Sequence, residues 1–237
     1  MLADSKIKGV KLFMTNIESR PRNFLGNVKE IMWTFPLYIL SSPFKGFDDM
    51  KFLKKGDMRY SIAILIIGAL VRINIQTNLG FVASGYHNPV PNTNVPLVIM
   101  MFLAPIILFT FANWSATTIT DGKGSIREIF QTYTYALFPS LVCTIIALLL
   151  SHVVTLNEGF FVVFFITMGN VLLYGYLFVG LIVIHEYSFL KAVIMVVLTI
   201  LAMLIITFVL ALFMSLLSNF MFFTYIIREE LRPHLGF

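Results

Sequence analysis

Residues 190–227 decide the fold class of this chain: they read LKAVIMVVLTILAMLIITFVLALFMSLLSNFMFFTYII, with Lys191 as the single charged side chain. A helix of 38 residues is about 57 Å long, whereas the hydrocarbon core of a bilayer is about 30 Å thick. The run is therefore apolar enough to cross a membrane and too long for one crossing. We expect one crossing over 190–217 followed by an amphipathic extension. The alternative is two crossings that turn near 215–219.

Four further apolar runs are each long enough to span a bilayer, at residues 60–79, 95–118, 126–150 and 160–184. Backbone groups in lipid must bond within their own segment, so these runs are predicted to be helices. They do not alternate as the strands of a membrane barrel do. Apolar residues make up 58% of the chain and charged residues 12%, which excludes an ordinary soluble domain. We predict an all-α membrane protein with about five transmembrane helices.

The Lys and Arg residues predict an orientation. Eleven of the 17 precede Tyr60. Further along, segments 80–94 and 151–159 hold none, and the remaining turns carry Lys123, Arg127 and Lys191. The positive-inside rule then places the N-terminus in the cytoplasm and the C-terminus outside the cell membrane. Because these cations flank apolar runs, they indicate membrane lipid as a partner and disfavour nucleic acid.

This pattern divides the chain into three parts. Residues 1–58 are expected to form cytoplasmic amphipathic and interfacial helices, 59–227 the five-helix membrane domain, and 228–237 a polar tail. Within the first part, Ile7, Val10, Met14 and Ile17 share one helical face. The apolar stretch 31–40 is too short to span and is interrupted by Pro36, which predicts an interfacial or re-entrant segment. A short helix over 50–55, capped by Asp48 or Asp49, is expected to stop at Gly56.

Polar side chains inside the predicted spans are candidate functional residues. Arg72 and Gln76 share a face of the first span, and Asn74 points elsewhere. With Asn170 of the fourth span, they could line a path for a solute or a lipid. The structural alternatives are an Arg72 side chain that reaches the nearby membrane surface and an Asn170 side chain that joins helices.

The most distinctive polar segment lies between the second and third spans. It begins at Asn113 and ends in Asp121-Gly-Lys123-Gly-Ser125. Asp-Gly-Lys-Gly is typical of a turn, and Ser125 with Glu128 forms a capping box that opens the third span. A lipid headgroup could bind at this helix start. A purely structural turn is the alternative, because the order of residues in a P-loop is absent.

The turn after the fourth span contains His185 and Glu186. It is not a zinc-protease motif, because Phe189 stands where the second histidine would be. We expect both side chains to pair with Lys123 or Glu128 of the neighbouring turn. The single cysteine, Cys143, lies in an apolar run and is expected to pack there. We predict no catalytic residue, no cofactor and no metal site.

Four segments together resemble the Ypt-interacting-protein (Yip) domain family, and its bacterial branch in particular. They are residues 43–49, 113–125, 135–139 and 180–187, and the resemblance covers roughly residues 40–225. It implies a five-helix domain with a cytoplasmic N-terminal region and no catalytic residues. Eukaryotic relatives are membrane adaptors that bind small GTPases. Some bacterial relatives are encoded beside carbohydrate import systems.

Three functional hypotheses follow. The first is a non-enzymatic accessory or scaffolding subunit that binds other membrane-protein subunits, with a carbohydrate ABC importer as the expected complex. The second is a transporter or channel for a small solute or lipid, built on Arg72, Asn74, Gln76 and Asn170. The third is an enzyme that acts on lipid at the cytoplasmic face through Lys123, His185 and Glu186.

Overall fold

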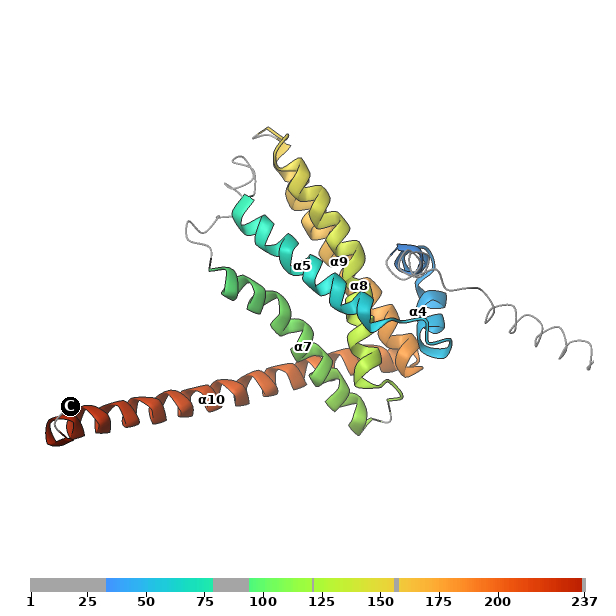
Figure 1. Ribbon diagram of the computed structural model, residues 1–237. Helices are drawn as coiled ribbons and strands as arrows, with labels where there is room; N and C mark the ends of the chain where they lie inside the picture. Colours follow the sequence, from blue (N-terminus) through green and yellow to red (C-terminus); the bar gives the residue numbers. More distant parts are fainter. Residues whose placement is uncertain (1–32, 79–93, 121, 156–157, 236–237) are drawn as a thin grey trace, which may run out of the picture.

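A computed structural model describes residues 33–78, 94–120, 122–155 and 158–235. The amphipathic helix predicted over 7–17 lies outside these residues. The described part is helical and contains no strand. Five of its helices are long and apolar enough to cross a membrane, and Figure 1 shows how they are arranged. They are α5 Met58–Asn78, α7 Val95–Ile119, α8 Ile126–Leu150, α9 Phe160–His185 and α10 Phe189–Leu235.

These bounds confirm the prediction of an all-α membrane protein. The predicted span over 126–150 coincides with α8, and those over 95–118 and 160–184 end one residue before α7 and α9. The prediction holds here because the signals are local. The capping box of Ser125 and Glu128 is formed at the start of α8, and Asn94 caps α7 by accepting a hydrogen bond from Leu97 N.

Helix α8 is the centre of the bundle and packs against α5, α7 and α9. Two thirds of its span (67%) is buried, compared with at most 28% of any other span. It is also the helix with the most buried polar side chains. Placing such a helix at the centre keeps these groups out of lipid, and most of the hydroxyls bond to carbonyl oxygens of α8 itself. The residues are Gln131, Thr132, Thr134, Ser140 and Thr144.

Two short helices precede the bundle, α3 Phe35–Ser41 and α4 Pro43–Phe52. Two predictions are corrected here. Pro36 does not break the apolar stretch: it lies in the first turn of α3, where a missing N–H costs nothing. The expected helix over 50–55 instead begins at Pro43, so Asp48 and Asp49 lie inside α4 and do not cap it.

Helix α10 is uninterrupted over 47 residues, so the alternative of two crossings with a turn near 215–219 is wrong. Its first part packs against α7 and α9, and the rest projects beyond the bundle (Figure 1). Every residue from Thr207 to Arg228 is exposed. The expected amphipathic extension is therefore also wrong: residues 208–227 expose large apolar side chains on all sides.

Candidate functional site

A chain of hydrogen bonds joins four segments at the end of the bundle where α9 ends and α10 begins. Gly124 N donates to Nδ1 of His185 (3.2 Å), and Nε2 of His185 lies 3.1 Å from Oδ1 of Asn113. Asn113 Nδ2 donates to Thr199 Oγ1 (3.0 Å), which donates to the carbonyl oxygen of Met195 (2.7 Å). Since Nδ1 accepts a hydrogen bond, Nε2 carries the proton and donates to Asn113. Each donor in this chain has an acceptor.

The side chains that form these hydrogen bonds are almost fully buried. His185 is 2% exposed and Asn113 1%. Buried polar groups of this kind stabilise a fold only when they are fully bonded. Because these hydrogen bonds connect α7, α9, α10 and the turn before α8, they fix how these elements meet. His185 was predicted to pair with Lys123 or Glu128; its hydrogen bonds go to Gly124 and Asn113 instead.

The turn between α7 and α8 approaches His185 so closely that two positions require glycine. A Cβ atom on Gly122 would lie 2.5 Å from Tyr187 Oη and 2.6 Å from Thr117 Cβ. On Gly124 it would lie 2.6 Å from His185 Cε1. The imidazole ring of His185 stacks on Tyr187, with ring centroids 5.1 Å apart. The glycines predicted to serve turn geometry thus also make room for the ring of His185.

Glu186 forms an ion bridge beside this buried chain. Its Oε1 accepts from Lys51 Nζ at 2.6 Å and its Oε2 from Lys123 Nζ at 2.5 Å. The pairing of Glu186 with Lys123 was predicted, and the contact with Lys51 of α4 was not. Glu186 has a φ of 55°, a left-handed conformation that a non-glycine residue adopts at a cost. It ends α9 while its carboxylate joins α4 to the turn before α8.

The two lysines change the acidity of Glu186. Hydrogen bonds from Lys123 and then Lys51 lower the pKa of its carboxyl from 4.5 to about 2. A carboxylate whose pKa is depressed by folding stabilises the fold above its unfolded pKa and loses that contribution as the pH falls through the folded pKa. The contribution of the bridge to stability is therefore complete above about pH 4.5 and is lost as the pH falls toward 2.

We expect Glu186→Gln to lower the thermal stability of the detergent-solubilised protein by the same amount at every pH between 5 and 8. Because the wild-type bridge is lost on protonation, the difference between the two proteins should shrink as the pH falls below about 4.5. Unfolding temperatures measured by intrinsic fluorescence across pH 3–8 test this. A difference that varies between pH 5 and 8 would assign the effect to another titrating group.

Helices α3 and α4 are attached to the bundle next to the ion bridge. Phe47 is fully buried, and its ring packs against Gly180 of α9. A Cβ atom on Gly180 would lie 3.2 Å from this ring. The hydroxyl of Tyr176 donates to Leu40 O at 2.6 Å. Three different contacts, one apolar, one polar and one ionic, therefore hold the α3–α4 segment to α9.

The polar residues predicted to line a solute path lie on two helices, α5 and α9, and none of them is fully buried. Asn74 is exposed, and its Nδ2 donates to Leu70 O of its own helix at 2.9 Å. Arg72 and Gln76 are half-buried on α5, and Asn170 is half-buried on α9. Asp121 lies outside the described residues. Of the ten candidates, Asn113, Lys123, Glu128, His185 and Glu186 come together at one end of the bundle.

Sequence reasoning missed two members of the site, Lys51 and Thr199. Lys51 is one of several lysines in its segment, and Thr199 is one of several hydroxyl residues scattered along a long apolar run. Their partners lie 135 and 86 positions away. Thr199 carried one usable signal: a polar side chain in an apolar span usually bonds to another helix.

The fold and site define an α-helical integral membrane protein whose polar motif residues meet at one end of its bundle. Residues 37–211 match the model of the Yip1 domain family. The match covers well over half of the chain, so the chain belongs to this family. No curated protein showed a significant match. No solved structure did either.

Proposed function

We propose that this chain is a non-enzymatic accessory or scaffolding subunit of a membrane complex. The polar groups that could have formed a reactive site have structural partners: His185 bonds to Asn113 and Gly124, and Lys123 pairs with Glu186. This use of His185, Lys123 and Glu186 argues against the lipid-acting enzyme. The intrahelical bond of Asn74 likewise argues against the transporter.

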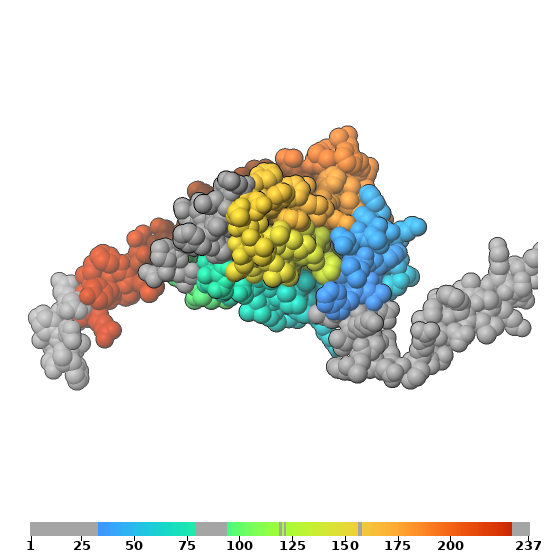
Figure 2. Space-filling model, turned by 90° about the horizontal axis from the view of Figure 1, so that it is seen from above, coloured from blue at the N-terminus to red at the C-terminus, as the bar shows by residue number. Residues whose placement is uncertain are grey.

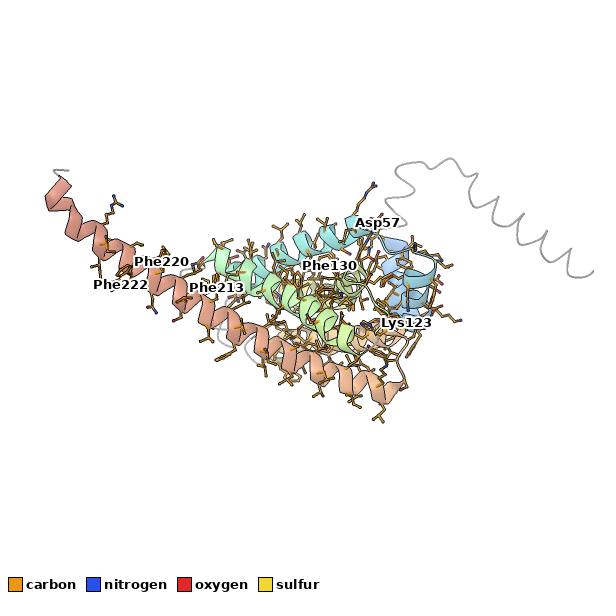
Figure 3. All side chains as sticks on the ribbon, turned by 90° about the horizontal axis from the view of Figure 1, so that it is seen from below. Asp57, Lys123, Phe130, Phe213, Phe220 and Phe222 are labelled. Atoms are coloured by element: carbon orange, nitrogen blue, oxygen red, sulfur yellow. The ribbon has the colours of Figure 1, made fainter. Side chains whose placement is uncertain are left out.

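The observation that carries the proposal is the distal part of α10, residues 207–228. All of its residues are exposed, and it presents large apolar side chains on every side. Figure 3 shows Phe213, Phe220 and Phe222 along this part of α10, with Phe220 and Phe222 beyond the bundle. Transmembrane helices associate through packing with other helices. An exposed helix of this length offers such a surface to neighbouring subunits.

The finer assignment is a carbohydrate ABC importer in the cell membrane, with the N-terminus in the cytoplasm. It rests on the sequence resemblance to the bacterial branch of the family. The charge pattern supports the orientation: Lys51, Lys123 and Lys191 lie at one end of the bundle, while the described residues 151–155 and 158–159 of the opposite end carry no Lys or Arg.

We expect the tagged chain to retain the permease and ATPase subunits of such an importer after solubilisation in a mild detergent. Replacing Phe213, Phe220 and Phe222 by alanine should reduce this retention, since each truncated side chain loses its van der Waals packing against the neighbouring helix. Quantitative mass spectrometry of the eluates measures it.

The matched control replaces Phe160, Phe161 and Phe164 of α9 by alanine. These three side chains are similarly exposed but lie on the bundle itself, so the retained subunits should be unchanged. A wild-type chain that returns only itself contradicts the scaffolding proposal. If the chain retains a different membrane complex and only the α10 variant loses it, the scaffolding proposal stands and the assignment to an ABC importer is contradicted.

A further inference from the structure

The segment that connects α4 to α5 lies at one end of the bundle, so in a bilayer it would be close to the lipid headgroups. Four membrane-spanning helices begin or end beside it: α5 begins at Met58, α8 at Ile126 and α10 at Phe189, and α9 ends at His185. The contacts of Lys51 and Lys123 with Glu186 bring these ends together. Figure 2 shows α3, α4 and the start of α5 as one continuous surface at one side of the bundle.

Basic side chains are abundant in this segment. Between residues 42 and 59, cations outnumber carboxylates five to three. Lys51 pairs with Glu186 and Lys55 with Asp49. Among the residues that the structure describes, Lys45, Lys54 and Arg59 form no ion pair, and all three are exposed. Asp48 and Asp57 of the same described segment form no ion pair either, so the segment keeps a small net positive charge, which would attract the phosphates of anionic lipids.

Large apolar side chains lie beside these cations. Phe52 is 58% exposed and Leu53 61%, directly before Lys54 and Lys55, and Phe44 is exposed on the same helix. On a surface facing water these side chains would be unfavourable. Apolar side chains next to lysines are typical of protein segments that insert into the headgroup region of an anionic membrane.

Lys54 also has a special backbone conformation, because it is the residue that follows the C-cap of α4. It has a φ of 50°, and it and Glu186 are the two non-glycine residues with positive φ that the described chain contains. Glycine or asparagine fits this position after a helix better than lysine does. A lysine here retains its charge in an unfavourable conformation.

We propose that residues 44–55 form a binding site for the headgroups of anionic phospholipids, in which Lys45 and Lys54 contact phosphates and Phe52 and Leu53 enter the acyl boundary. The site goes beyond the scaffolding function and does not depend on it. It would hold the α3–α4 segment against the leaflet next to the ion bridge.

The test uses the full chain with Trp33 and Trp114 replaced by phenylalanine and a single reporter, Phe52→Trp. The protein is reconstituted in phosphatidylcholine vesicles that contain either brominated phosphatidylglycerol or brominated phosphatidylcholine, which quench nearby tryptophan. We expect brominated phosphatidylglycerol to be preferred about fivefold, the factor per lysine at an anionic surface. The preference should fall at high salt because salt screens exposed charges.

Lys54 offers a matched pair of variants. Lys54→Gly removes the charge at a position whose conformation glycine prefers, so the fold is kept while the lipid preference should fall clearly, because one of the two phosphate-binding lysines is lost. Lys54→Arg keeps the charge and should keep the preference. A second reporter, Phe160→Trp, lies at the end of the bundle without described cations and should show no preference.

Three outcomes would overturn the site. The reporter at position 52 could escape quenching by either lipid, which would mean that the segment faces water or protein. It could be quenched equally by both lipids at all salt concentrations. The preference could also survive Lys54→Gly unchanged. The salt dependence is measured on the reporter chain alone, so it decides the proposal even if a lysine variant fails to fold.

Discussion

Gly180→Leu is expected to destabilise the domain by about 3 kcal/mol, the upper part of the range for overpacked cores, and to release α4 from α9. A Cβ atom at this position would already lie within 3.2 Å of the Phe47 ring, and Thr132 of the central helix is closer still. Both neighbours are fully buried, so neither can move aside. Denaturation in mixed micelles measures the stability, and limited proteolysis of residues 42–57 reports the release of α4.

The control is Gly175→Leu, the same substitution in the same helix. A Cβ atom on Gly175 would meet nothing within 4 Å, so the new side chain extends into lipid. Leucine favours a helix over glycine, so this variant should be unchanged or slightly more stable. Equal losses in the two variants would show that α4 does not pack on Gly180 as described.

Asn113→Leu is expected to cost about 2–3 kcal/mol, because it leaves the buried Nε2–H of His185 without an acceptor and removes the bond to Thr199. Asparagine and leucine have the same number of side-chain heavy atoms and the same branching at Cγ, so the change mainly removes hydrogen bonds. Since Thr199 lies on α10, the variant should also loosen α10 from α7. Unfolding in mixed micelles gives the energy, and hydrogen exchange of α10 gives its location.

Asn74→Leu serves as the reference for this variant. Its amide is exposed and donates within α5, so the change should stay within about 0.5 kcal/mol, as for other surface positions. If Asn113→Leu were equally mild, the series of hydrogen bonds that runs from Gly124 through His185 to Thr199 would not hold the helices together.

The helices were predictable from the sequence because their signals are local. Apolar length, the capping box at Ser125 and Glu128 and the glycine turn each depend on residues a few positions apart, and the structure has all of them. The short helices were less predictable. Pro36 can end a helix or begin one, and the choice is made by Phe35 and Ile39 packing into the core.

The site was half predictable. Asn113, Lys123, His185 and Glu186 were recognised as candidates because polar residues at the ends of membrane helices are costly unless they have partners. Their partners were assigned incompletely. His185 and Asn113 are 72 positions apart, and a single sequence contains no information about which distant side chains meet. The same limit hid Lys51, which reaches Glu186 from another helix.

The uninterrupted length of α10 has a consequence for the plane of the membrane. The apolar run of 38 residues from Leu190 to Ile227 is about 57 Å long, so it fits within a hydrocarbon layer of about 30 Å only when tilted by about 60°. Ordinary transmembrane helices tilt by about 0–40°. At that tilt α10 would extend about 50 Å sideways, roughly five helix diameters. A neighbouring protein that binds the far end of α10 would then be held at about this lateral distance from the bundle.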